Sequence, residues 1–185
     1  SHTVRAQKNG YPARSVFKLK EIQASFHILK RGGRVLDLGC SPGSWLLFSS
    51  QAVGPKGRVV GVDLAPISIG LPANTRFVRY DVLNWDGPLL EDLGGPFDVV
   101  LSDMAPATTG SKIVDSQRSL DLCESAMAIA LKVLKPKGVF VCKIFHGPDF
   151  KNFSDRTKGF FGRVSHLRPK TTRKASKEIY IIALE

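Results

Sequence analysis

The sequence has few of the features that mark secreted, metal-binding or membrane proteins. It holds only three cysteines among its 185 residues, Cys40, Cys123 and Cys142, and no two are spaced C-x-x-C. An odd number at such spacings predicts neither a disulfide framework nor a zinc site. No apolar run approaches the roughly 20 residues that a membrane-spanning helix needs. We therefore expect a cytoplasmic protein without disulfides, bound metal or a membrane partner.

Acidic residues are scarce relative to basic ones, and the imbalance lies at the two ends of the chain. The net charge is +11. Residues 1–34 hold 8 basic residues against 1 acidic, and residues 151–185 hold 9 against 3, whereas the middle of the chain is slightly acidic. Two basic ends around a near-neutral centre favour a polyanion held beside a small-molecule site. The alternative is a basic surface without a partner.

Length and patterning predict one α/β domain over residues 1–185, with a basic arm and helix in residues 1–31 ahead of a core in residues 34–185. From Arg34 onward, short β-rich runs alternate with helical ones, which is typical of βαβ units and a parallel sheet. The expected helices cover residues 13–29, 44–53, 115–134 and 149–161. The expected strands cover residues 34–38, 58–63, 75–80, 97–102, 139–143, 163–167 and 178–184.

The stretch Val35–Trp45 predicts a buried strand, a glycine-flanked turn and a helix. In an open α/β sheet, such a turn lets the backbone approach a ligand at the carboxyl end of the first strand. A dinucleotide site would have G-x-G-x-x-G, but here Gly39 and Gly43 are four apart and enclose Pro42, which donates no amide hydrogen. The turn therefore favours a cofactor without a pyrophosphate and argues against NAD or FAD.

Aspartates stand at the ends of the first three expected strands. Asp63 can accept hydrogen bonds from the two ribose hydroxyls of an adenosine, Asp81 from an adenine amino group, and Asp37 can face an ammonium group. Three carboxylates around one crevice favour a cationic adenosine ligand, and S-adenosyl-L-methionine carries both a sulfonium and an ammonium group. The alternative is that each aspartate only forms a turn.

Two further charged residues interrupt apolar runs. Asp103 follows the buried run Phe97–Ser102, where it would enter the same crevice, although it could instead only shape the turn before Pro106. Lys143 lies inside an apolar run, where burial without a partner is unfavourable. It could extend its ammonium group to the surface, or it could face a methyl donor beside Asp103. Taken alone, Lys18 is predicted to be a solvated surface lysine, and Glu178 is predicted only to begin a strand.

Taken together, these elements resemble the FtsJ/RrmJ family of ribose 2′-O-methyltransferases over essentially the whole chain. The motifs that carry the resemblance lie at residues 15–19, 37–45, 102–106, 142–143 and 177–180. The resemblance implies a Rossmann-like methyltransferase fold with a mostly parallel seven-stranded sheet, helices on both faces and an antiparallel last strand. Two positions depart from the family pattern: Ala107 replaces a usual asparagine, and Ser44 stands where glycine is common.

The resemblance also implies roles for individual residues. A catalytic Lys-Asp-Lys-Glu tetrad falls on Lys18, Asp103, Lys143 and Glu178. The implied contacts to S-adenosyl-L-methionine are Gly43, Trp45, Asp63, Asp81 and Asp103. Gly39 and Asp37 are expected to contact it as well, because of their place at the end of the first strand. Methyl transfer to a 2′-hydroxyl would leave S-adenosyl-L-homocysteine. Lys143 would be the base or orient the hydroxyl, because burial and a second cation favour a neutral lysine whereas two carboxylates oppose it.

The family's substrate is RNA, and the resemblance implies a uridine of 23S rRNA within the 50S ribosomal subunit. Relatives that act on tRNA or on the mRNA cap leave those substrates as alternatives. A non-catalytic RNA-binding protein with this fold and a nucleotide-dependent oxidoreductase remain alternatives of another class. We expect a monomer. Its basic ends would contact phosphates through Arg14, Lys20, Arg168, Lys170, Arg173 and Lys174.

Overall fold

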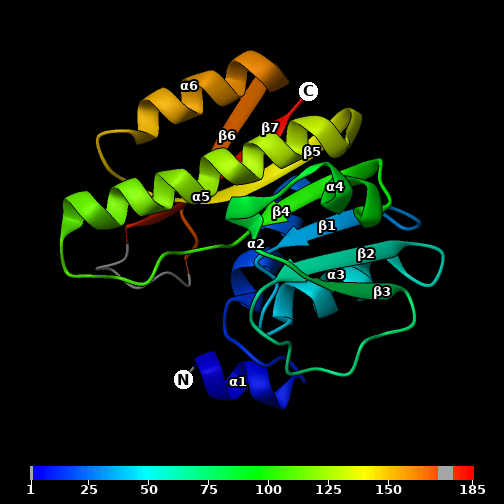
Figure 1. Cartoon of the computed structure of the whole chain (residues 1–185). Helices are drawn as coiled ribbons and strands as arrows, with labels where there is room; N and C mark the ends of the chain where they lie inside the picture. Colours follow the sequence, from blue (N-terminus) through cyan, green and yellow to red (C-terminus); the bar gives the residue numbers. More distant parts are fainter. Residues whose placement is uncertain (1, 171–176) are drawn as a thin grey trace.

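The computed structural model describes residues 2–170 and 177–185, and its centre is one seven-stranded sheet (Figure 1). The strand order is β3-β2-β1-β4-β5-β7-β6. The strands from β1 to β5 run parallel, and β7 runs antiparallel to both of its neighbours. Their bounds are β1 Arg34–Leu38, β2 Arg58–Asp63, β3 Thr75–Arg79, β4 Phe97–Ser102, β5 Leu134–Phe145, β6 Arg163–Leu167 and β7 Glu178–Leu184. The predicted mostly parallel sheet with an antiparallel last strand is confirmed.

Helices cover both faces of the sheet, and each face has its own apolar core. Leu36, Val100 and Phe140 pack on the face covered by α4, α5 and α6, whereas Val35, Val99 and Val141 pack on the face of α2 and α3. Alternate strand residues therefore belong to opposite cores. The helices are α1 His2–Lys8, α2 Val16–Phe26, α3 Ser44–Val53, α4 Gly87–Leu93, α5 Lys112–Val133 and α6 Phe150–Phe161, with a 3-10 turn η1 at Val82–Asn84. No helix of the described chain is long and apolar enough to cross a membrane.

The structure adds elements that the sequence patterns did not predict. The N-terminal arm, predicted without regular structure, contains α1, which buries Ala6 against Tyr11 and Val16. Helix α4 was also missed, although the side chain of Asp86 caps its first turn by accepting from the Leu89 amide. Strand β5 begins at Leu134 rather than 139, because Leu134, predicted as the last residue of a helix, is already extended and pairs with Phe97 of β4.

The strand order reverses between β1 and β4. From β1 the chain proceeds outward to β2 and β3, and it returns across the sheet to β4 on the other side of β1. In open α/β sheets, ligands bind outside the carboxyl ends of the strands at such a reversal. The fold therefore places a ligand crevice where the sequence analysis expects the cofactor.

Candidate active site

A cavity of about 290 Å³ opens at the carboxyl ends of β1, β2 and β4. Its walls include Gly39, Asp63, Asp81, Asp103 and Met104. The structure thus brings together four of the predicted cofactor residues, which come from four separate turns. Three carboxylates line one small opening, so the cavity is suited to a ligand that carries positive charge and hydrogen-bond donors.

The turn after β1 needs its glycines for close packing. Gly39 has φ +74°, and a Cβ atom there would lie 2.2 Å from Cγ of Met104. Gly43 has φ +120°, and its Cβ would lie 2.9 Å from Cγ1 of Ile69. Any side chain at Gly39 would displace Met104 into the cavity, so this glycine keeps the ligand space open. Gly43 does not line the cavity; it begins α3 and packs against the loop after β2.

Asp63 and Asp81 are both turn residues and cavity residues. Oδ2 of Asp63 accepts from the Ser41 amide at 2.9 Å and thereby ties β2 to the glycine turn. Oδ1 of Asp81 accepts from the Leu83 amide at 3.0 Å and caps η1. The turn-forming and ligand-binding interpretations of these aspartates are therefore compatible, because the turns hold the carboxylates at the cavity wall.

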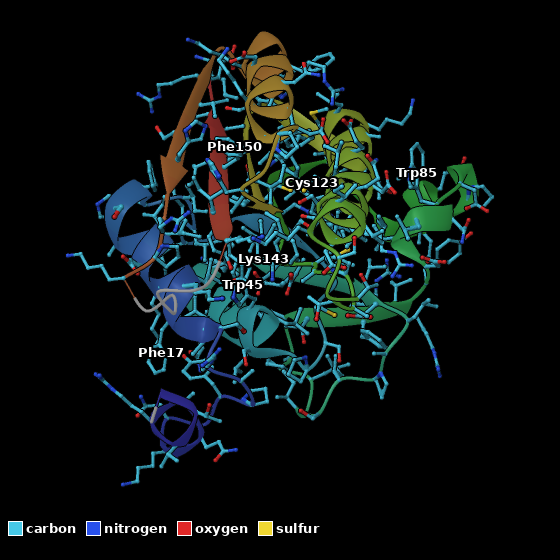
Figure 2. All side chains as sticks on the ribbon, turned by 90° about the vertical axis from the view of Figure 1, so that its left-hand side faces the viewer. Phe17, Trp45, Trp85, Cys123, Lys143 and Phe150 are labelled. Atoms are coloured by element: carbon cyan, nitrogen blue, oxygen red, sulfur yellow. The ribbon has the colours of Figure 1, made fainter. Side chains whose placement is uncertain are left out.

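Besides Gly43, two other predicted cofactor residues, Asp37 and Trp45, do not line the cavity. Asp37 is 1% exposed and, like Val35, lies on the α2–α3 face of β1. The indole of Trp45 is 3% exposed, donates to the Ser15 carbonyl at 2.9 Å and packs against the Tyr180 ring. In Figure 2, Trp45 lies near Lys143 at the centre of the molecule. Trp45 therefore packs against Tyr180 and does not form part of the cavity wall.

Asp37 should destabilise the fold at neutral pH. Neither carboxylate oxygen has a hydrogen-bond partner within the described chain, and burial, followed by Asp103 and Asp63, raises the pKa of Asp37 well above its ordinary value. As pH rises above about 4, the unfolded chain releases this proton while the folded chain retains it, so stability falls. We expect Asp37→Asn to stabilise the protein at pH 8 by at least about 1 kcal/mol, measured by urea unfolding.

The stabilisation by Asp37→Asn should shrink as pH falls to about 4, where the Asp37 carboxyl group is protonated in both the folded and the unfolded wild type. Asp121→Asn is the control, because Asp121 is exposed on α5. An equal effect of Asp37→Asn at pH 4 and pH 8 would contradict the burial of an ionisable carboxylate as the cause.

Beside the cavity, Lys143 forms the centre of a charged cluster. Its Nζ lies 3.4 Å from Oδ1 of Asp103 and 3.7 Å from Oε1 of Glu178. Nζ of Lys18 lies 2.5 Å from Oε2 of Glu178. The four residues of the predicted tetrad are thus connected in a chain of alternating charge. The Lys143 side chain is only 7% exposed, so it does not extend to the surface as the alternative interpretation required.

Strand periodicity explains why these four residues meet. Lys143 lies two residues beyond Val141 and therefore shares its face of the sheet, the face covered by α2. Tyr180 is the register partner of Lys143 on β7, and Glu178 lies two residues before it on the same face. Asp103 follows the neighbouring strand β4, and α2 lies over this face with Lys18 toward it. Residues 160 positions apart in sequence thereby form an ion pair.

The cluster lowers the pKa of Glu178 and holds Asp103 in place. Burial acts to raise the pKa of Glu178, but Lys143 and Lys18 together hold it below its ordinary value. Tyr180 donates its hydroxyl proton to Oδ1 of Asp103 at 2.5 Å. Burial, reinforced by Asp103, raises the pKa of this phenol well above its ordinary value, so it stays a donor. Sequence reasoning missed Tyr180; its signal was the two-residue spacing from Glu178 in a strand.

The predicted RNA-contacting residues divide into three groups. Arg168 and Lys170 are exposed, and the Lys170 amide donates to the Glu21 carboxylate, which ties the segment after β6 to α2. Arg14 is half-buried, and the ammonium of Lys20 lies 4.7 Å from the centre of the Tyr11 ring. The Lys20 contact stabilises the N-terminal arm against α2. Arg173 and Lys174 lie outside the described residues.

Comparisons with known proteins agree with this architecture. The FtsJ-like methyltransferase family matches residues 11–185. A protein named ribosomal RNA large subunit methyltransferase E from Desulfatibacillum aliphaticivorans is 51% identical over 98% of this chain and 87% of its own length. One of the same name from Bdellovibrio bacteriovorus is 46% identical over 97% of this chain and 93% of its own length.

Solved structures lead to the same conclusion. A crystal structure described as a ribosomal RNA methyltransferase from Plasmodium falciparum superposes with a TM-score of 0.83 at 25% identity, covering 95% of this chain and 98% of its own. Human methyltransferase-like protein 13, solved with S-adenosyl-L-homocysteine, shares the fold at a TM-score of 0.64 and 17% identity, covering 89% of this chain and 80% of its own. Because the family matches residues 11–185 and relatives named as methyltransferases share about half of its residues over nearly the whole chain, this chain belongs to the FtsJ-like methyltransferase family.

Proposed function

We propose that this protein transfers a methyl group from S-adenosyl-L-methionine to a ribose 2′-hydroxyl of 23S rRNA in the large ribosomal subunit. The observation that carries the proposal is Lys143, buried between Asp103 of the acidic cavity and Glu178. A buried lysine at a cavity edge, held by two carboxylates, is suited to proton transfer or to orienting a hydroxyl.

The residues of the cavity fit S-adenosyl-L-methionine. We assign Asp63 to the ribose hydroxyls and Asp81 to the adenine amino group, with Asp103 facing the positively charged end of the ligand. Gly39 keeps the space between them open, since its Cβ would meet Met104. When bound, the cofactor supplies an electrophilic methyl group. The cavity wall carries three carboxylates, and the turn from Gly39 to Gly43 lacks the middle glycine that admits a pyrophosphate, which together disfavour NAD and with it an oxidoreductase.

Each member of the tetrad has a defined task in this proposal. In its neutral amine form, Lys143 would take the proton of the ribose 2′-hydroxyl, while the cofactor would supply the methyl group and leave as S-adenosyl-L-homocysteine. Asp103 and Glu178 hold the Lys143 ammonium group from two sides and keep Nζ at the cavity edge. Lys18 pairs with Glu178 and thereby fixes the carboxylate that contacts Lys143.

The RNA substrate is inferred from the curated relatives, whose names state that they act on large-subunit ribosomal RNA. The experiment is transfer of a radiolabelled methyl group to purified large subunits, to tRNA and to capped mRNA. We expect label in the large subunits alone. Label only in tRNA or in the cap would identify that RNA as the substrate instead, and cofactor binding without transfer to any RNA would support a non-catalytic RNA-binding protein.

We also propose a cytoplasmic location, with which the three free, buried cysteines are in keeping.

RNA binding should depend strongly on salt, because exposed cations of both chain ends would contact phosphates. If about six phosphates are contacted, affinity for large-subunit RNA should fall by roughly 10³-fold between 50 and 200 mM salt. Filter binding over this range gives the slope of log affinity against log salt. Lys170→Ala should flatten the slope by about one phosphate contact, whereas Lys132→Ala, far along α5, should leave it unchanged. A flat slope for the wild type would contradict phosphate contacts by the basic ends.

A further inference from the structure

A second cavity, of about 300 Å³, lies where the start of α5 meets the ends of β5 and β7. It shares no lining residue with the first cavity. Its wall includes Glu178, whose carboxylate lies 3.7 Å from Nζ of Lys143, whereas Asp103 of the first cavity lies 3.4 Å from the same atom. Lys143 therefore contacts one carboxylate from the wall of each cavity.

Hydrogen bonds hold the walls of the second cavity in place. Oδ1 of Asp115, at the start of α5, accepts from both the amide and the hydroxyl of Thr109 at 2.8 Å, which fixes the loop before the helix. The Phe145 amide donates to Oγ of Ser119 at 3.0 Å. The His146 amide donates to the Lys177 carbonyl at 2.7 Å and joins the ends of β5 and β7. The space is thus framed by the secondary structure that positions the tetrad.

The lining chemistry matches one nucleotide rather than a simple anion. Phe145 offers an aromatic surface, while Asp115 and Ser116 offer polar groups for the edge of a base. Lys112 and Lys177 supply two cations at the same opening, where phosphates on either side of a nucleotide can be held. Two carboxylates beside two lysines leave no net positive charge, which disfavours a site for free phosphate alone.

In-line methyl transfer requires the acceptor oxygen to approach the methyl carbon from the side opposite the sulfur. Asp103 lines the donor cavity and Glu178 lines the second cavity, so a nucleotide in the second cavity would bring its ribose to Lys143 from outside the donor cavity. Resting on the function proposed above, we infer that the second cavity receives the base of the nucleotide whose ribose is methylated, with Phe145 against the base and Lys112 and Lys177 at the neighbouring phosphates. The bound nucleotide is one that is unpaired or splayed out of its helix, because a stacked base could not enter.

Filling the cavity tests this inference. Ser116→Phe places a ring in the space, and Gln117→Phe makes the same change at the next position on α5, which is exposed and outside the cavity lining. We expect Ser116→Phe to lower kcat/KM for large ribosomal subunits by about tenfold or more, the range that loss of one base–aromatic stack gives. S-adenosyl-L-homocysteine affinity, measured by calorimetry, should stay within about twofold of the wild type, since the donor cavity is untouched. Gln117→Phe should leave both quantities unchanged.

A second pair of variants avoids any change of packing. Lys112→Glu reverses a charge at the cavity, and Lys132→Glu makes the same reversal at an exposed position near the other end of α5. We expect Lys112→Glu alone to raise KM for the subunits. Wild-type kcat/KM in both Ser116→Phe and Lys112→Glu would overturn the inference. An effect of Lys112→Glu without one of a folded Ser116→Phe would also overturn it, since phosphates but no base would then be bound. An inactive wild type that still binds S-adenosyl-L-homocysteine would instead refute the proposed function.

Discussion

Lys143→Arg should lower the single-turnover rate of methyl transfer by about 10²- to 10⁴-fold, the contribution that a positioned acid–base group makes. Arginine keeps the positive charge and can still pair with Asp103 and Glu178, but its guanidinium does not lose a proton in proteins. Proton acceptance is thus the main property removed. The rate is measured with large ribosomal subunits in excess over a preformed complex of enzyme and radiolabelled S-adenosyl-L-methionine.

Lys135→Arg is the matched control, because Lys135 lies on the same strand and forms only an exposed ion pair with Asp98. It should transfer methyl groups at the wild-type rate. If Lys143→Arg retained more than about a tenth of the wild-type rate while Lys143→Ala did not, a fixed positive charge at this position would be sufficient for methyl transfer. Lys143 would then orient the hydroxyl without taking its proton.

Asp103→Asn should lower the transfer rate by about 10²-fold and also weaken binding of S-adenosyl-L-homocysteine. The carboxylate contacts Lys143 at 3.4 Å and Tyr180 at 2.5 Å, and it also lines the cofactor cavity. Removal of its charge releases one side of the Lys143 ammonium group, and a displacement of about 1 Å in a reacting group can reduce a rate by 10²-fold. Calorimetry with S-adenosyl-L-homocysteine separates the loss of binding from the loss of rate.

Asp121→Asn makes the same chemical change at an exposed position on α5 that lines neither cavity, and it should alter neither quantity. Tyr180→Phe, which keeps the ring but not the hydroxyl, should show a smaller loss of rate than Asp103→Asn. Unchanged rate and binding in Asp103→Asn would mean that this carboxylate is only a turn residue, the alternative that the sequence left open.

Strand periodicity made most of the sheet predictable from the sequence. Buried strands of an α/β sheet are short apolar runs with definite ends, so β1, β2 and β4 lie at the predicted residues. Helix α4 was missed because seven residues are too few for a helical period, although Asp86 and Pro88 mark its first turn. Helix α1 was missed because its polar sequence buries little more than Ala6.

The site was only partly predictable because its residues meet through tertiary packing. Asp63 and Asp81 lie at the cavity wall since parallel strands end at one edge of the sheet. Asp37 lies one position before the end of β1, and the alternation of side chains turns it into the core instead. The pairing of Lys18 with Glu178 joins the two ends of the chain, so only the family resemblance indicated it.

Mapping of 2′-O-methyl groups on 23S rRNA is the most direct test of methyl transfer by this tetrad. Large subunits that lack the modification are incubated with S-adenosyl-L-methionine and either the wild type or Lys143→Arg, and each ribose is then assayed for resistance to alkaline cleavage. We predict one new resistant ribose with the wild type and none with Lys143→Arg. A methyl group found on a base, or no new modification with the wild type, would contradict the proposed function.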